Sequence, residues 1–193
     1  MSRLIRASEL LPNARYKEMR REFFQRGIEE TRKRRVSLGP HATLTFQSRE
    51  LVLIQLQEML LAEPDANPEE ELEAYNPLVP DGSSLVFTLM FEIDSPVLRE
   101  QTLLQLGGVE KTLELRLPPS LAVSGVPLEE RVEVQRTSRE GKTSAVHFMR
   151  FALSRQQAEA AKGPVVVACT HPHYGHSATL SPDAWEEIRR DLD

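Results

Sequence analysis

The sequence has one cysteine, no excess of positive charge and no long apolar run, and each scarcity excludes a class of protein. The lone Cys169 excludes an internal disulfide, a protein-held iron–sulfur cluster and a cysteine-rich zinc finger. Among 193 residues, 24 Lys and Arg face 29 Asp and Glu, and a net charge of −5 argues against nucleic-acid coats and binders of anionic membranes. The longest apolar run, residues 165–169, is too short to cross a bilayer, and the first residues lack the apolar core of a secretory signal. We therefore expect a cytoplasmic protein.

Standard catalytic and nucleotide-binding motifs are also missing. The chain has no glycine-rich dinucleotide or phosphate loop, no nucleophile-elbow serine, no H-E-x-x-H and no C-x-x-C. Cys169 follows a run of apolar residues and is expected to be an inert core residue.

Positive charge is concentrated at the start of the chain. Residues 1–40 hold 11 Lys and Arg against 5 Asp and Glu, so the rest of the chain is strongly acidic. Apolar residues recur at three- and four-residue steps from Tyr16 to Ile28, which predicts a helix over residues 13–35 with a charged opposite face. We expect residues 1–35 to be a helical arm packed on a single domain that spans residues 1–193.

The remaining pattern predicts an α+β fold. Helices are expected over residues 49–61, 68–75, 95–106, 154–162 and 181–192, with Ser48 and Ser181 as N-caps. Alternating or apolar segments predict strands over residues 34–38, 41–47, 84–93, 111–117 and 164–170, and a hairpin of 130–136 with 144–153. Two prolines predict a structured loop over residues 76–82. The expected fold is a mostly antiparallel sheet of five or six strands, with a long N-terminal helix and helices on one face.

Three histidines stand at strands or strand ends, as the ligands of a metal site on a sheet would. His41 follows the Gly39-Pro40 break, His147 lies within a strand, and His171 ends another. Neutral imidazole suits iron, zinc, nickel or manganese, and a carboxylate usually completes the set. His173 and His176 lie in a polar loop and are expected to be exposed, outside the site.

Glu58 is the preferred carboxylate, and Glu92, near the end of a strand, is the second choice. Glu58 lies on a predicted helix three residues after Gln55, so the two share a face. The alternative is structural, because a single strand histidine is more often a hydrogen-bonded core residue and Glu58 more often a solvated one.

Five ordered strings of residues resemble an uncharacterised bacterial family known only as a domain of unknown function. The strings cover residues 34–41, 54–60, 75–82, 142–148 and 171–174. Members of this family are often encoded beside rubrerythrin-like proteins and an iron–sulfur oxidoreductase. The resemblance implies an iron or oxidative-stress context and carries over no activity. Polar residues recur at the matching positions, which core packing alone would not require: His41, Gln55, Glu58, Tyr75, Asn76, Asp81, His147, His171 and Tyr174.

Two hypotheses of different classes follow. In the first, His41, Glu58, His147 and His171 bind one divalent metal, a ferrous-type ion, in a metal-dependent oxidoreductase. Its second-shell or substrate-binding residues are Tyr174, Asn76 and Gln55. In the second, the protein is a non-enzymatic adaptor whose basic N-terminal helix docks an acidic rubrerythrin-like protein or iron–sulfur oxidoreductase. A nucleic-acid role for residues 32–35 ranks third, because the basic run is short and lacks interleaved aromatic residues.

Overall fold

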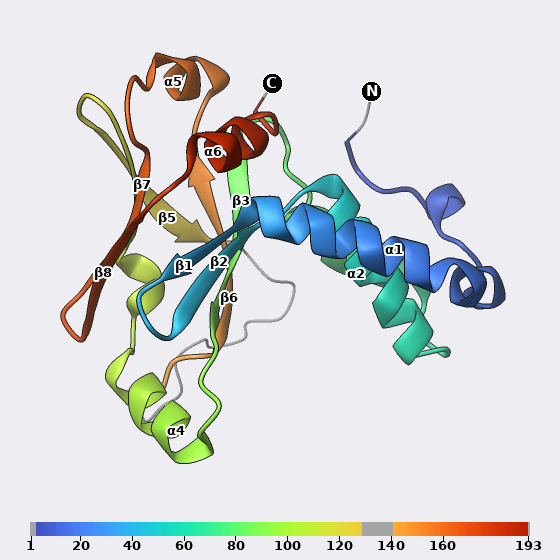
Figure 1. Ribbon diagram of the computed structural model, residues 1–193. Helices are drawn as coiled ribbons and strands as arrows, with labels where there is room; N and C mark the ends of the chain where they lie inside the picture. The colour runs from blue at the N-terminus through green and yellow to red at the C-terminus, as the bar shows by residue number, and fades with distance from the viewer. Residues whose placement is uncertain (1–2, 129–140, 193) are drawn as a thin grey trace.

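A computed structural model describes residues 3–128 and 141–192, and these residues form one sheet of eight strands with helices around it (Figure 1). The strands are β1 (Arg35–Leu38), β2 (Ala42–Phe46), β3 (Ser84–Phe91), β4 (Leu113–Leu117), β5 (Leu121–Pro127), β6 (Val146–Ala152), β7 (Val166–His171) and β8 (Tyr174–Thr179). The α-helices are α1 (Asn13–Arg34), α2 (Arg49–Ala62), α3 (Pro68–Tyr75), α4 (Pro96–Gln105), α5 (Arg155–Ala160) and α6 (Pro182–Arg189). Short 3-10 turns are η1 (Ala7–Glu9), η2 (Asn76–Leu78) and η3 (Val109–Lys111).

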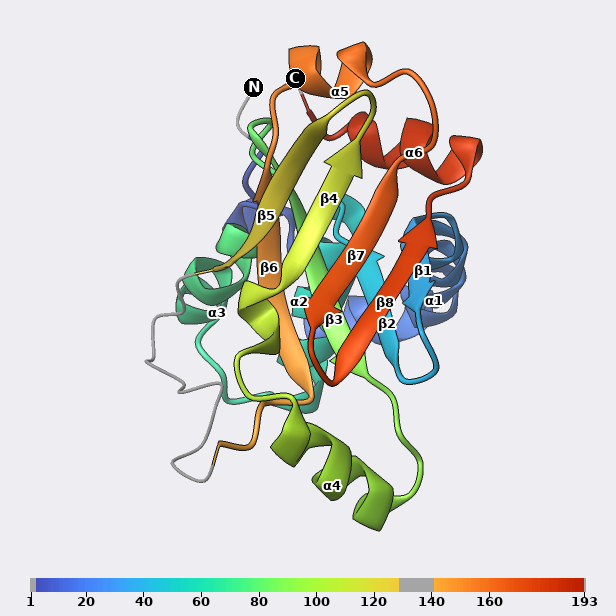
Figure 2. The same cartoon turned by 90° about the vertical axis from the view of Figure 1, so that its left-hand side faces the viewer.

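The sheet runs in the order β1-β2-β3-β6-β5-β4-β7-β8, and every neighbouring pair is antiparallel. It curls until β1 and β8 come close to each other, so its shape approaches a barrel (Figure 2). The curl is sharp at β5, whose first half pairs with β4 and whose second half pairs with β6. Gly125 lies at this change of partner, where a Cβ atom would come within 3.2 Å of the Leu113 Cβ. A glycine is needed there because two strands approach each other closely.

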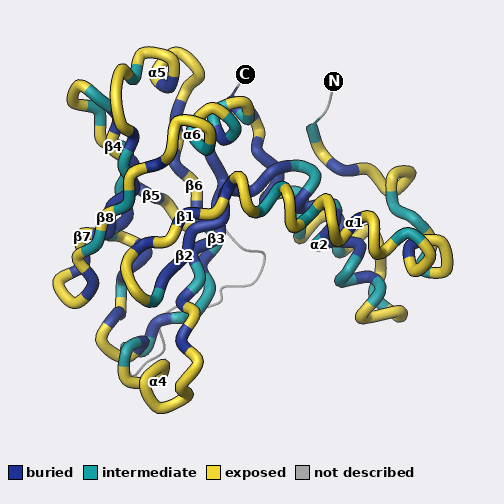
Figure 3. Tube along the Cα trace, in the orientation of Figure 1, coloured by how far each residue is buried: buried dark blue, intermediate teal, exposed yellow. Residues whose placement is uncertain are grey.

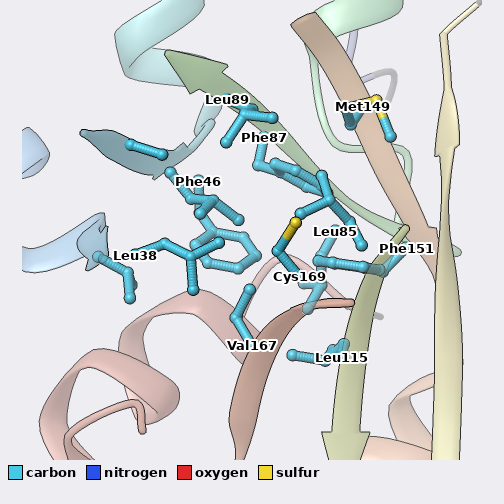
Figure 4. Close-up of a cluster of buried hydrophobic side chains, with 14 of the residues drawn as sticks. Leu38, Phe46, Leu85, Phe87, Leu89, Leu115, Met149, Phe151, Val167 and Cys169 are labelled. Atoms are coloured by element: carbon cyan, nitrogen blue, oxygen red, sulfur yellow. The ribbon is translucent and has the colours of Figure 1, made fainter. Parts of the chain in front are cut away.

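The main hydrophobic core fills the inside of the curled sheet (Figure 4). Alternate residues of each strand point inward, as the period of a strand requires. Phe46, Phe87 and Phe151 meet at its centre, and the rings of Phe87 and Phe151 are stacked with their centroids 4.5 Å apart. Cys169 is a buried member of this core, as the sequence predicts.

Two smaller clusters hold the N-terminal helices together. Tyr16 and Phe23 of α1 pack on Ile54 of α2, and the other side of α2 packs on α3 and the loop after it. Figure 3 shows the resulting alternation of buried and exposed positions along α1. Ser48 begins α2 as predicted, since its side chain accepts a hydrogen bond from the Leu51 backbone N–H.

The predicted helices are confirmed within one to three residues at their ends, but the sheet is larger than predicted. The prediction missed β5 and β8, because their half-exposed, polar or glycine-containing sequences lack a clear apolar period. The predicted strand 130–136 lies outside the described residues. Helices are also not confined to one face: α1, α2 and α3 lie on one side, whereas α4 lies at one end of the sheet and α5 and α6 at the other (Figure 2).

The predicted loop 76–82 is held against the fold. It begins with η2, and Leu78 and Val79 are buried in the cluster under α2. No described helix is both long enough and apolar enough to span a membrane.

Candidate functional site

Glu58, the predicted carboxylate ligand, is used to join α1 to α2. Its Oε1 accepts hydrogen bonds from the Tyr16 hydroxyl at 2.8 Å and from Arg20 Nε at 2.9 Å, and its Oε2 pairs with Arg20 Nη2 at 2.8 Å. The Arg20 guanidinium, assisted by Tyr16, holds the pKa of Glu58 below its usual value against the opposing effect of burial. Glu58 is therefore an ionised structural residue on the helical side of the molecule.

His147 faces the inside of the sheet on β6, and it is almost completely buried. Its Nε2 lies 3.0 Å from the Ser144 carbonyl oxygen and 3.1 Å from Thr143 Oγ1. Because a carbonyl only accepts hydrogen bonds, Nε2 carries the proton and donates it to Ser144. A protonated Nε2 cannot bind a metal, so Nδ1 is the ring atom of His147 that could be a ligand.

His171, at the end of β7, forms hydrogen bonds with the backbone through both of its ring nitrogens. Its Nε2 lies 3.4 Å from the Gly107 carbonyl oxygen, and its Nδ1 accepts the His173 backbone N–H at 3.2 Å. Both ring nitrogens are thus engaged by the backbone of neighbouring loops. His41 lies in the β1–β2 turn, at the same end of the sheet.

The four predicted ligands do not form one group. In the described part of the chain, no three His, Cys, Asp or Glu side chains are placed to hold a metal ion. Glu92, the second carboxylate, pairs with Arg35 Nη2 at 2.6 Å and accepts a hydrogen bond from Thr43. The strand histidines share an end of the sheet, but backbone groups engage one ring nitrogen of His147 and both ring nitrogens of His171.

The three residues predicted to assist catalysis also connect parts of the fold. The Tyr174 hydroxyl donates to the Leu38 carbonyl at 2.7 Å and accepts the His41 N–H at 2.9 Å, which joins β8 to the β1–β2 turn. The Asn76 side chain bonds both the N–H and the carbonyl of Ile5. Gln55 donates to Gln47, which in turn donates to Thr88 of β3, and this links α2 to the sheet. The structure does not bring these residues together.

His176, expected to be exposed and outside the site, is partly buried where β8 meets the β1–β2 turn. Its ring meets Tyr174 edge-on with centroids 4.5 Å apart. A Cβ atom on Gly39 would lie 2.6 Å from this ring, so the imidazole packs directly on the glycine backbone.

The surface with the strongest functional character is one exposed face of α1, which we call the α1 stripe. Five exposed residues at spacings of three and four lie along it: Lys17, Arg21, Phe24, Ile28 and Arg32. Phe24 and Ile28 expose 55% and 56% of their surface, although the inner face of the helix already packs on α2. An apolar pair that folding does not use is typical of an interaction surface.

Several basic residues of α1 form ion pairs, among them Arg15 with Glu18 of the same helix. Arg20 and Arg26 pair with Glu58 and Glu50 of α2, and Arg34 is buried among acidic residues of α1 and α6. The cations of the α1 stripe form no ion pair with any described residue. The sequence pattern assigned Phe24 and Ile28 to the inner face of the helix. The missed signal is the Phe23-Phe24 pair, because successive residues of a helix point in directions about 100° apart, and Phe23 is the one that packs on α2.

Comparison with known proteins identifies the family. Residues 4–192 match the family model described as "Protein of unknown function (DUF3501)". The chain belongs to the DUF3501 family.

A solved structure supports the fold described above. The chain is similar to a protein of unknown function from Burkholderia pseudomallei K96243, with 34% sequence identity and a TM-score of 0.88. The similarity covers 98% of this chain and 99% of the other. No curated protein matches the chain. The predicted membership of an uncharacterised family is therefore confirmed.

Proposed function

We propose that this DUF3501 protein is a non-enzymatic binding protein that docks an acidic protein partner through the α1 stripe. The observation that carries the proposal is the pair Phe24 and Ile28, more than half exposed, among cations without ion pairs in the described chain. The apolar pair would supply the buried centre of the interface and the cations its rim.

The charge of the α1 stripe selects the partner. Lys17, Arg21 and Arg32 lie beside the apolar pair, and these three cations outnumber the neighbouring exposed carboxylates Glu18 and Glu29, of which Glu18 already pairs with Arg15. Such a surface favours a carboxylate-rich partner and speeds its association, with an effect that salt weakens. A rubrerythrin-like protein or an iron–sulfur oxidoreductase, the partners suggested by the family resemblance, are the candidates to test.

The test measures association of the purified full-length chain with each candidate partner by biolayer interferometry. The first variant reverses Lys17, Arg21 and Arg32 to Glu, and the second replaces Phe24 and Ile28 by Ser. Arg20 and Arg26 stay unchanged, because reversing them would place carboxylates against Glu58 and Glu50. A matched control reverses three exposed cations outside α1, namely Arg99, Lys111 and Lys162.

We expect the charge reversal to slow association by about tenfold or more and the Ser variant to speed dissociation. The control variant should bind like the unchanged protein. Binding that survives both the stripe variants and about 1 M salt, where the Debye length is ~3 Å, would contradict the proposal.

The metal hypothesis remains a prediction, and elemental analysis tests it. Protein purified without a histidine tag should carry less than stoichiometric iron, zinc, nickel or manganese if the chain is only an adaptor. One metal ion per chain, lost in His147→Ala, would instead favour a metal-binding protein of redox function.

A further inference from the structure

A cavity of about 750 Å³ opens between the outer face of the sheet and the N-terminal segment, away from the residues of the α1 stripe. Its volume lies within the range of small-molecule sites. Its apolar lining includes Leu4, Pro77, Val79, Val86 and Leu128. Its polar lining includes Glu73, Asn76, Asp81, Ser84 and Arg150.

The fold builds this cavity from distant segments. The Asn76 side chain accepts a hydrogen bond from the Ile5 N–H at 2.9 Å and donates one to the Ile5 carbonyl at 3.1 Å, which holds the neighbouring Leu4 in the lining of the cavity. Val86 of β3 and Arg150 of β6 are register partners, and they alternate with inward-facing residues such as Phe87 and Phe151. Both side chains therefore project from the outer face of the sheet toward the cavity.

Arg150 is the cation among the described residues that line this cavity. The side chain is exposed and forms no ion pair or side-chain hydrogen bond with any residue that the structure describes. Asp81, the acidic residue of the loop 76–82, also lines the cavity, and its Oδ1 accepts hydrogen bonds of 2.8 to 3.0 Å from Ser83 and Ser84. Burial raises the pKa of Asp81, but these hydrogen bonds outweigh burial and leave the pKa below its usual value. Asp81 is therefore ionised, and its carboxylate stabilises the turn in which it lies.

We propose that this cavity binds a small organic monocarboxylate with an apolar body. The planar guanidinium of Arg150 matches a carboxylate with two parallel hydrogen bonds. Val79, Val86 and Leu128 would cover the apolar body. Arg150 supplies one positive charge and two carboxylates, Glu73 and Asp81, also line the cavity, so nucleotides and other polyphosphates are disfavoured, in agreement with the absence of a phosphate-binding motif.

Isothermal titration of the full-length protein with decanoate, below its micelle concentration, tests this site. Decanol and decylamine have the same apolar chain with a neutral and a cationic head group, and inorganic phosphate is an anion without an apolar body. We expect decanoate to bind with one molecule per chain, and the other three probes to bind at least about tenfold more weakly.

Two variants locate the binding. Arg150→Gln keeps much of the stem and removes the charge, so decanoate affinity should fall about tenfold or more. Arg116→Gln, the matched control, changes an exposed arginine on β4 and should leave the affinity unchanged. Equal binding of decanoate and decanol, unchanged affinity in Arg150→Gln, or no binding of decanoate at about 1 mM would each overturn the proposal.

Discussion

At the scale of single residues, Tyr16 and Glu58 show how a polar pair secures a helix interface. Tyr16 is fully buried, and Glu58 is the acceptor for its hydroxyl. Burial, followed by the hydrogen bond to Glu58, raises the pKa of Tyr16 well above its usual value. The hydroxyl therefore stays protonated and donates to Glu58 at all ordinary pH values.

Glu58→Ala should destabilise the protein by ~1–3 kcal/mol, because the buried Tyr16 hydroxyl loses its acceptor. Glu58→Gln keeps an acceptor oxygen and loses only the partly exposed pair with Arg20, so its cost should stay below ~1 kcal/mol. Urea unfolding at neutral pH measures both. Equal costs for the two variants would contradict the role given to Tyr16.

The lowered pKa of Glu58 also predicts a pH dependence. A carboxyl whose pKa is lower in the folded state stabilises the fold above its unfolded pKa, about 4.3, and loses this contribution as pH falls through the folded pKa. The unchanged protein should therefore lose more stability below about pH 4 than Glu58→Gln does. Urea unfolding of both proteins across this range checks the sign.

Tyr174→Phe should cost ~1–3 kcal/mol of unfolding free energy, because Leu38 and His41 lose their shared hydrogen-bond partner. Tyr75→Phe is the matched control, since no described residue hydrogen-bonds the Tyr75 hydroxyl, and it should cost less than ~0.5 kcal/mol. Denaturant unfolding compares the two. A cost for Tyr174→Phe as small as that of the control would show that its hydroxyl does not stabilise this junction.

At the scale of elements, α1 uses its two sides differently. Its inner side packs on α2, and its C-terminal end reaches α6 through Arg34. Arg34 is almost completely buried and pairs with Glu30, Glu187 and Asp191 at 2.8, 3.3 and 2.5 Å. This cluster joins segments near opposite ends of the sequence.

Arg34→Met should destabilise the protein by ~3–5 kcal/mol, because it leaves partly buried carboxylates without their cation. Burial already raises the pKa of Asp191, and loss of Arg34 would raise it further. A carboxyl whose pKa is raised in the folded state destabilises the fold while it is ionised, and protonation removes this penalty. The loss in unfolding free energy caused by Arg34→Met should therefore become smaller as pH falls. Thermal unfolding at neutral and acidic pH measures this. Arg32→Met, at an exposed neighbour, is the control and should change stability by less than ~0.5 kcal/mol.

At the scale of the whole molecule, closure of the curled sheet depends on a few contacts between β1 and β8. These strands are not paired as a ladder, and Tyr174, His176 and Gly39 lie where they meet. Gly39 has a φ of 69°, which favours glycine, and the His176 ring occupies the space where another residue would carry its Cβ.

Gly39→Ala should therefore cost more than backbone strain alone, which is ~1–2 kcal/mol. In a His176→Ala background the steric part disappears, and the cost of Gly39→Ala should fall toward the strain value. A double-mutant cycle measured by denaturant unfolding checks this coupling. Independent, additive costs would show that the ring does not press on Gly39.

Local signals in the sequence determined the helices of this protein and much of its sheet. Ser48 and Ser181 accept hydrogen bonds from the first turns of α2 and α6, and Pro68 stands in the first turn of α3, so these boundaries need no distant contact. The inward face of β6, with His147, Met149 and Phe151, likewise followed from the two-residue period. Membership of an uncharacterised family was also readable from ordered strings of residues.

Tertiary structure alone decided what the polar residues do. The sequence places Glu58 on a helix, but only the packing of α1 on α2 assigns it to Tyr16 and Arg20. It places His147 and His171 at strands, but the backbone carbonyls of Ser144 and Gly107 occupy their Nε2 atoms. The exposure of Phe24 and the position of Arg150 over a cavity depend equally on which surfaces other elements cover. Periodicity is a local property of the chain, whereas the partner of a side chain is set by segments that can lie more than a hundred residues away.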